Sequence, residues 1–154
     1  MILREKDLPE MEYAMLAKEV LSIGAEYQMP VILHTYVEVA ARLKVDSLHL
    51  PVASLLSLSE EKKKDFRVLG ASVHSAEEAC AAYHAGATYL TAGHVFVTDC
   101  KKGVPPRGLD FLKEVCEAVP VPVYAIGGIT EENAVSCVAA GAAGVCMMSG
   151  YMRF

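Results

Sequence analysis

The sequence lacks most of the features that would assign it to a specialised class of protein. It has no Trp, no CxxC pair among its 5 cysteines, and a formal net charge of −5. An odd number of cysteines without a metal-binding spacing indicates free thiols in a reducing compartment, not a disulfide framework or a zinc site. Because affinity for nucleic acid rests largely on Lys and Arg, the acidic balance and the absence of a basic run argue against that partner.

Long hydrophobic runs are also missing. The longest apolar stretch, residues 137–148, is interrupted by glycine, whereas a membrane-spanning helix needs about 20 residues. Charged residues from Arg4 onward leave no apolar segment for a signal peptide. With 53% hydrophobic and 21% charged residues among 154, the composition excludes disorder and predicts one domain over residues 1–154. We therefore expect a cytoplasmic protein that does not bind membranes.

Short apolar runs alternate with helical patterns along the whole chain. Ser75 and Glu78 have the spacing of a capping box at a helix start, and Gly24, Gly86 and Gly141 are expected to end helices. The predicted strands cover residues 1–5, 29–34, 47–51, 67–72, 87–93, 121–128 and 143–150. The predicted helices cover residues 9–23, 36–43, 75–86, 108–119 and 130–141, with a short solvated helix within a loop at 55–64.

The predicted strands are continuously apolar, which is typical of parallel strands buried on both faces. Strict alternation of strands and helices indicates βαβ units and an α/β fold. Both an open doubly wound sheet and a (β/α)8 TIM barrel fit this pattern. A barrel usually needs about 250 residues, and this chain starts on a strand and stops just after one. We therefore expect a TIM barrel that lacks its first strand–helix unit and its last helix.

One candidate site is a glycine pair at the end of the strand before the last helix. In YAIGGIT, Gly127 and Gly128 let backbone N–H groups approach an oxyanion, and the helix that Thr130 begins adds positive potential. The next strand ends in Ser149 and Gly150. In barrels, ligand phosphates are bound after strands seven and eight. We expect a phosphate site here; the alternative is that the glycines only permit tight turns.

A second candidate is the long loop GHVFVTDCKKG, residues 93–103. It follows a strand and carries an imidazole, a hydroxyl, a carboxylate, a thiol and two lysines. Histidine is suited to proton transfer near neutral pH, so His94 is the candidate acid–base residue. Lys101 or Lys102 could hold an anion. The alternatives are a structural histidine bonded to backbone, solvated lysines and an inert Cys100 thiol.

Other strand ends give weaker signals. Arg4 and Lys6 follow the first strand and suit an anionic substrate, and Ser72 to His74 and His34 end two further strands. We expect His49 to be packed and His84 to be solvated. HExxH, Walker and GxGxxG motifs are absent. The sequence therefore predicts a site for a phosphorylated small molecule, with acid–base chemistry and no evident metal or cofactor.

With these residues in place, the chain resembles the family of thiamine phosphate synthases and TenI-type thiazole tautomerases. The matching segments, in order, are LREKDL, LHLP, GASVHS, GHVFVTDCKKG, YAIGGIT and GVCMMSG. The resemblance covers nearly the whole chain and implies a (β/α)8 barrel in which LREKDL ends the second strand.

The resemblance implies two activities. The synthase joins a pyrimidine diphosphate to a thiazole phosphate with magnesium, and its third strand ends in an Asn-Asp pair where this chain has His34 and Thr35. Its loop begins Gly-Pro, where this chain has Gly93 and His94. The tautomerase instead aromatises a dihydrothiazole carboxylate phosphate without a metal. The loop resembles the tautomerase branch, so a cofactor-free thiazole tautomerase is the first expectation.

The resemblance also assigns roles to residues of this chain. It makes His94 the catalytic base, and it places a homo-oligomer among the expected assemblies. The alternatives are thiamine phosphate synthase, with Mg²⁺, or a non-catalytic paralogue that binds a phosphorylated metabolite. The implied substrate-binding residues are Arg4, Lys6, Ser72, Thr98 and Lys101, and the implied phosphate-binding residues are Gly127, Gly128, Ser149 and Gly150.

Overall fold

The computed structural model describes residues 1–101, 103–148 and 150–151. It separates the chain into two compact units, Met1–Gly70 and Ala71–Phe154. Each unit is an arrangement of parallel strands and helices in its own right, and each carries part of the residues that the sequence singles out.

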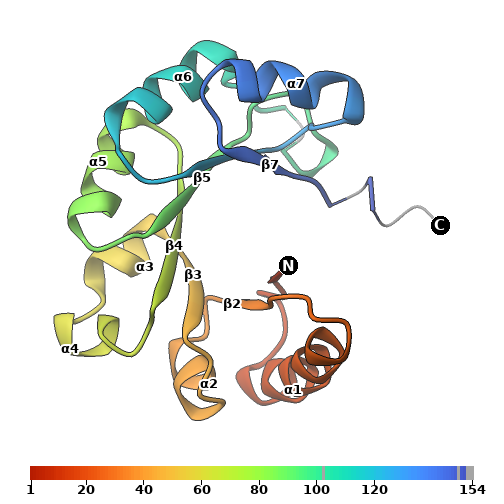
Figure 1. Ribbon diagram of the computed structural model, residues 1–154, viewed down its shortest axis with the longest axis vertical. Helices are drawn as coiled ribbons and strands as arrows, with labels where there is room; N and C mark the ends of the chain where they lie inside the picture. The colour runs from red at the N-terminus through yellow and green to blue at the C-terminus, as the bar shows by residue number, and fades with distance from the viewer. Residues whose placement is uncertain (102, 149, 152–154) are drawn as a thin grey trace. The chain divides into compact units, whose positions relative to one another are not determined.

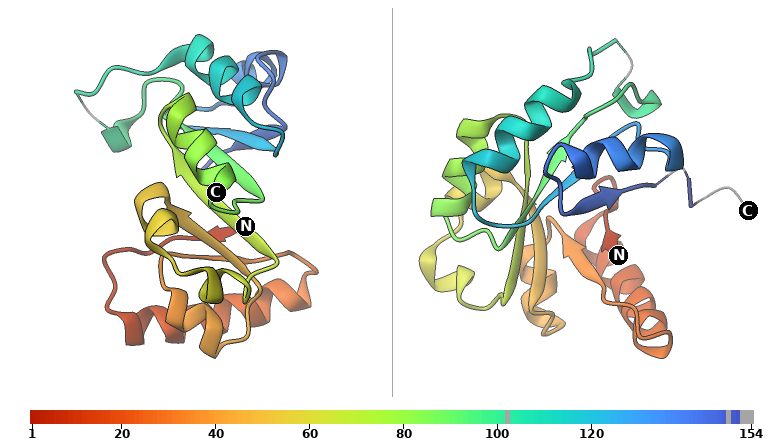
Figure 2. Two further views of the ribbon diagram at one scale, coloured as in Figure 1. Left: turned by 90° about the vertical axis from the view of Figure 1, so that its left-hand side faces the viewer. Right: turned by 45° about the horizontal axis from the view of Figure 1, so that its top comes forward.

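The Met1–Gly70 unit contains three parallel strands in chain order. Strand β1 pairs with β2 and β2 with β3, in a register that places His34 opposite His49. Helices α1 and α2 lie on the same side of β2 (Figures 1 and 2). The elements are β1 (Ile2–Leu3), α1 (Glu10–Glu26), β2 (Ile32–His34), α2 (Val37–Arg42), β3 (Ser47–Pro51), α3 (Val52–Ser57) and α4 (Glu60–Lys63).

Two details of this unit differ from the sequence-based expectation. The sequence predicts a helix end at Gly24, but α1 continues to Glu26. Gly24 is instead needed for packing, because a Cβ there would lie 2.6 Å from Cγ2 of Val31 and 2.9 Å from the carbonyl oxygen of Met29. Residues 52–63 form the two short helices α3 and α4 where a loop with one short helix is expected.

The Ala71–Phe154 unit contains the rest of the chain, and strand β4 crosses the boundary. Strands β5, β6 and β7 are parallel neighbours in chain order, with Gly93 opposite Ile126 and Ile126 opposite Cys146. Helices α5, α6 and α7 follow one another along these strands (Figure 1). The elements are β4 (Val68–Val73), α5 (Ala76–His84), β5 (Tyr89–Gly93), the 3₁₀ helix η1 (Asp99–Lys101), α6 (Gly108–Ala118), β6 (Val123–Ile126), α7 (Glu131–Ala139) and β7 (Gly144–Cys146).

The strand order decides between the two folds that the sequence allows. In a doubly wound sheet the order reverses at a switch point, whereas successive strands within each unit are direct neighbours and parallel. The chain therefore has an α/β fold of the TIM-barrel type, as expected. None of the helices in the described part of the chain is long and apolar enough to cross a membrane.

Candidate functional site

His94 lies directly after β5 and is buried, with 4% of its surface exposed. The peptide bond between Gly93 and His94 is cis. The ring atom Nε2 lies 3.3 Å from the carbonyl oxygen of Val104. Because a carbonyl can only accept, Nε2 carries the proton in this contact and Nδ1 keeps its lone pair. Among the described residues Nδ1 has no hydrogen-bond partner and is buried, so the geometry leaves a shielded basic nitrogen.

Backbone hydrogen bonds fix the loop that carries His94. The N–H groups of Val95 and Phe96 each donate over 3.0 Å, to the carbonyls of Ile126 and Gly127 respectively. On the other side, the carbonyl of His94 accepts from the N–H of Arg107 at 3.1 Å. The loop is thus tied both to the end of β6 and to the start of α6, which restrains the position of the imidazole.

The close contact between the His94 loop and the end of β6 requires glycine at positions 127 and 128. Gly127 has φ +97°, and a Cβ there would lie 2.4 Å from Cβ of His94. Gly128 has φ +68°, and its Cβ would lie 2.3 Å from the carbonyl oxygen of Val97. Both the backbone conformation and the available space therefore demand glycine. Close packing thus explains why both residues are glycine, and binding of phosphate stays a prediction.

The start of α7 contributes less positive potential than the sequence suggests. Oδ1 of Asn133 accepts the N–H of Thr130 at 2.9 Å, and Nδ2 of Asn133 donates to the carbonyl of Gly128 at 2.9 Å. Glu131 and Glu132 lie in the first turn, and a hydrogen bond from the side chain of Thr130 lowers the pKa of Glu132. An anion here would depend on the glycine turn more than on the helix end. The spacing from Thr130 to Asn133 could have revealed Asn133 as a capping residue.

Ser72 lies near the end of β4 and is half-buried. The hydroxyl of Thr91, on β5, donates to Oγ of Ser72 at 3.2 Å. Thr91 is buried, with 3% of its surface exposed, and was not identified from the sequence because a single Thr within an apolar strand gives no signal. The two hydroxyls form a polar link inside the Ala71–Phe154 unit.

The remaining predicted residues of this unit differ in how many contacts restrain them. The carbonyl of half-buried Thr98 accepts the N–H of exposed Lys101 at 3.1 Å. Gly150 is exposed, and a Cβ there would come no closer than 3.8 Å to Sδ of Met147, so its environment does not demand glycine. Ser149 and Lys102 lie outside the described residues, as does the side chain of Cys100.

In the Met1–Gly70 unit, the predicted cations follow β1, His34 ends β2 and His49 lies in the middle of β3. Arg4 and Lys6 are exposed. His34 and His49 are buried and stacked, with ring centroids 5.3 Å apart, as expected for His49. Burial is the main cause that lowers the pKa of His34 to about 4 and that of His49 to about 3, and the charge of Arg4 lowers both further. Both imidazoles are therefore neutral near pH 7.

Two neighbours hold His34 in place. Nδ1 of His34 lies 2.5 Å from Oγ1 of Thr35, whose backbone has a positive φ of 70°. The buried hydroxyl of Tyr13 accepts the backbone N–H of His34 at 2.9 Å and donates to the carbonyl of Leu3 at 2.9 Å. Tyr13 was not identified from the sequence, where it looks like one more core residue of a helix.

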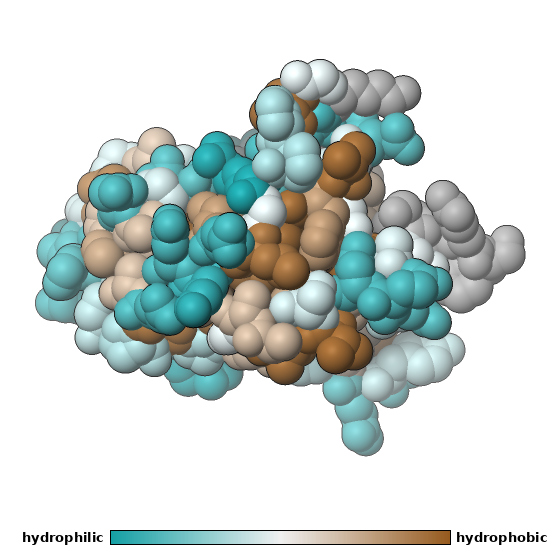
Figure 3. All heavy atoms as spheres, turned by 90° about the horizontal axis from the view of Figure 1, so that it is seen from above, coloured by the Kyte–Doolittle hydropathy of each residue, from teal (hydrophilic) through white to brown (hydrophobic). Residues whose placement is uncertain are grey.

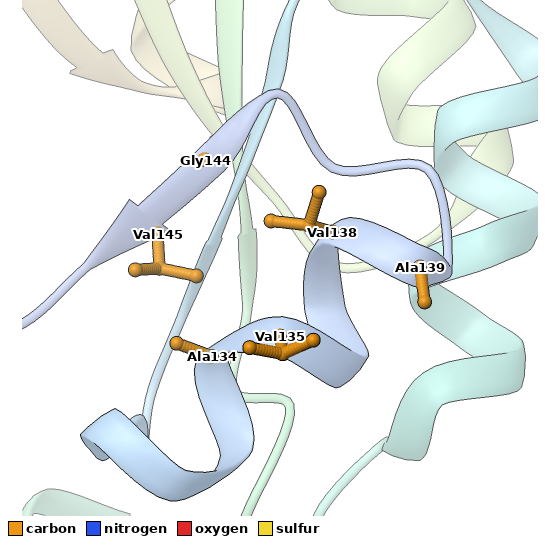
Figure 4. A pocket seen from close by; sticks show the side chains of 6 residues that line it. All are labelled: Ala134, Val135, Val138, Ala139, Gly144 and Val145. Carbon is orange, nitrogen blue, oxygen red and sulfur yellow. The ribbon is translucent and has the colours of Figure 1, made fainter.

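An apolar groove of about 470 Å³ lies elsewhere in the Ala71–Phe154 unit, between α7 and β7 (Figure 4). It contains no titratable side chain, and its exposed members include Val135 and Val138. Hydrophobic side chains also lie exposed among hydrophilic ones on the face in Figure 3. Within the described ranges no group of three or more His, Cys, Asp or Glu residues could hold a metal ion. The lack of a titratable side chain in its lining excludes the groove from acid–base chemistry.

The fold and the site define a TIM-barrel-type protein with a shielded histidine beside a glycine turn. A family model described as thiamine monophosphate synthase matches residues 1–151. The chain therefore belongs to the thiamine monophosphate synthase family, a family of enzymes of thiamine biosynthesis.

Individual relatives agree with this assignment. The chain is 34% identical over 152 residues to a thiamine-phosphate synthase of Clostridium novyi, covering 97% of this chain and 74% of that protein. It is 36% identical over 151 residues to a putative thiamine-phosphate synthase 2 of Aquifex aeolicus, covering 98% and 81%. The solved structure of a thiamine phosphate pyrophosphorylase from Pyrococcus furiosus has a TM-score of 0.81 at 32% identity, covering 96% of this chain and 71% of that one.

Proposed function

We propose that this protein is a thiazole phosphate tautomerase of thiamine biosynthesis. The observation that carries the proposal is the environment of His94: a buried imidazole whose Nε2 faces the carbonyl of Val104 and whose Nδ1 has no partner in the described part of the chain. A general base needs an available lone pair and a fixed position. His94 has both, and the loop sequence around it resembles the tautomerase branch of the family.

The reaction requires only movement of a proton. The substrate is a dihydrothiazole carboxylate that carries an ethyl phosphate; one ring carbon loses a proton, an exocyclic carbon gains one, and the ring becomes aromatic. No atom other than hydrogen is transferred, so the atoms and electrons of the reaction balance without a metal or cofactor. Nδ1 of His94 would take the ring proton, with Nε2 kept as a donor by the carbonyl of Val104.

The other predicted residues would bind the substrate. The turn at Gly127 and Gly128 would hold the phosphate through backbone N–H groups, together with Ser149 and Gly150. Thr98, Lys101 and Ser72 would contact the remainder of the substrate. Arg4 and Lys6, in the Met1–Gly70 unit, stay substrate-binding residues that only the resemblance to the family implies.

Thiamine phosphate synthase is the second candidate, and the names of the relatives favour it. That reaction uses Mg²⁺, which prefers hard anionic oxygen ligands. At the strand end where synthases have Asn-Asp, this chain has the neutral ring of His34 hydrogen-bonded to Thr35. These two residues do not fit a divalent cation, so we derive no step through the metal.

The two candidates are separated by paired assays on the purified chain. In the first, the dihydrothiazole carboxylate phosphate is supplied without metal and aromatisation is followed by ultraviolet absorbance. In the second, the pyrimidine diphosphate and thiazole phosphate are supplied with magnesium and thiamine phosphate is measured. We expect turnover in the first assay and none in the second. The reverse result would establish the synthase.

Substitution of the base tests the residue assignment. His94→Asn should lower the tautomerase rate by about 100-fold or more, because general-base catalysis contributes about 10²–10⁴-fold. His84→Asn is the matched control, since His84 is exposed on α5 and should leave the rate unchanged. If neither assay shows turnover while the product still raises the melting temperature, the chain is a binding paralogue.

A further inference from the structure

A second histidine of the Ala71–Phe154 unit is held by a carboxylate. His74 follows β4 directly, and its Nδ1 lies 3.3 Å from Oε2 of Glu78. Because a carboxylate only accepts, the contact places the proton on Nδ1 and leaves Nε2 as the reactive nitrogen. A carboxylate behind an imidazole fixes the tautomer and stabilises the imidazolium.

The position of Glu78 departs from an ordinary capping box. Ser75 begins α5, and its Oγ accepts the N–H of Glu78 at 3.1 Å. In a capping box the glutamate reaches back to the N–H of the capping residue itself. Oε2 of Glu78 instead accepts the N–H of His74 at 2.6 Å, one residue further back. That shift brings the carboxylate beside the imidazole while still restraining the start of the helix.

His74 and His94 are complementary in their access to water. The side chain of His74 is 37% exposed, whereas His94 is 4% exposed. His94 has its proton on Nε2 and a free Nδ1, and His74 has the opposite arrangement. His74 also continues the face of β4 that carries Ser72, two residues earlier, because side chains alternate along a strand.

We propose that His74 is a second catalytic residue of this protein, an acid that protonates the exocyclic carbon, and that Glu78 is its positioning residue. The inference rests on the proposed tautomerase function and adds to it. A buried base that removes the ring proton and a water-accessible acid that supplies a different proton would divide the reaction between two histidines.

The proton balance of this two-residue scheme closes. The ring C–H bond breaks, its electron pair forms the new ring double bond, and the proton goes to Nδ1 of His94. The exocyclic carbon takes a proton from Nε2 of the His74 imidazolium, which Glu78 stabilises. After the product leaves, His94 gives its proton to water and His74 takes one from water, so no oxidant or cofactor is required.

Solvent deuterium distinguishes one residue from two. In D₂O, a single shielded base that carries the same hydrogen between carbons would give largely unlabelled product. The two-histidine scheme predicts about one deuterium per product molecule at the exocyclic carbon from the first turnovers, measured by mass spectrometry and NMR. Incubation of the purified product with enzyme in D₂O controls for later exchange. Unlabelled product from the wild-type protein would overturn the proposal.

Substitutions separate catalysis from helix capping. His74→Gln should lower kcat by about 100-fold and reduce deuterium incorporation. Glu78→Gln keeps an oxygen that accepts the N–H of His74, so we expect the melting temperature to hold while kcat falls by about tenfold and deuterium incorporation falls with it. His84→Gln, on the exposed face of α5, is the matched control and should change none of these quantities.

The outcomes also separate this proposal from the one on which it rests. If turnover is lost in His94→Asn but His74→Gln stays within about twofold of wild type with unchanged labelling, this inference is wrong and the tautomerase assignment stands. If the wild-type protein shows no aromatisation at all, both are wrong. A kcat loss in His74→Gln without any change in labelling would assign His74 a structural role and overturn its role as the acid.

Discussion

The two units of the chain use histidines on or directly after their strands in different ways. In the Met1–Gly70 unit, His34 and His49 stack on each other and are buried, and Nδ1 of His34 faces the hydroxyl of Thr35, which can donate as well as accept. In the Ala71–Phe154 unit, His74 and His94 each contact an oxygen acceptor, a carboxylate and a carbonyl respectively. The comparison teaches that a position on a strand or at its end does not define the role of a histidine; the partner of each ring nitrogen does.

The physical reason is the cost of charging a buried ring. Two imidazoles that face each other disfavour protonation of either one, and burial adds a desolvation cost. An oxygen acceptor instead fixes which nitrogen holds the proton and frees the other. The first pair is thus suited to a neutral packed position, and the second pair to proton transfer.

The largest expected effect comes from the turn that packs against His94. Gly127→Ala would place a Cβ 2.4 Å from Cβ of His94 in a backbone with φ +97°. The positive φ and the clash together should lower the free energy of unfolding by about 3 kcal/mol and disturb the imidazole. Urea unfolding followed by circular dichroism, together with the tautomerase rate, measures both consequences.

Gly86 provides the matched control for that substitution. It has the same φ of +97° but nothing within 4 Å of its missing Cβ. Gly86→Ala should therefore cost only the backbone term, about 1–2 kcal/mol, and leave the rate unchanged. Equal losses of stability in the two variants would show that the contact with His94 is not what constrains Gly127.

A smaller loss of stability is expected when the tyrosine hydroxyl that holds the backbone of His34 is removed. Tyr13→Phe removes the acceptor for the N–H of His34 and the donor to the carbonyl of Leu3. Because Tyr13 is fully buried, both backbone groups lose their partner, which should cost about 2 kcal/mol in the free energy of unfolding. Tyr27→Phe is the control, since Tyr27 is 71% exposed. A loss below that of the control would mean that water replaces the hydroxyl.

Much of this fold was predictable from the sequence because its signals are local. Continuous apolar runs mark the strands, and Ser75 with Glu78 marks a helix start that the structure confirms. The end of α1 was not predictable, because Gly24 looks like a helix terminator, whereas its lack of a side chain is instead required by the close approach of Val31. That contact joins a helix to a later segment, and single-sequence patterns do not report such packing.

The candidate site was predictable in its residue types but not in its partners. A histidine after a strand is visible in the sequence, yet the pairing of its Nε2 with Val104 depends on how the loop folds back. Likewise, the stacking of His34 on His49 follows from the register of β2 and β3. Nothing in the sequence indicated that Thr91 and Tyr13 form their hydrogen bonds, because each contributes only one side-chain hydroxyl to an otherwise apolar pattern.

The effect that depends on solution conditions is the acid sensitivity of the His34–His49 pair. The folded-state pKa values of about 4 and about 3 lie below the ordinary value of 6.5, so the unfolded chain binds more protons between pH 4 and 6.5. Stability should therefore be complete above pH 6.5 and fall as the pH drops, by at most about 1.4 kcal/mol per pH unit for each histidine. His34→Phe should flatten this slope, and His84→Phe should not. Unfolding measured by urea from pH 7 to pH 4.5 tests it, and an equal slope in wild type and His34→Phe would mean that His34 is protonated in the folded protein as readily as in the unfolded chain.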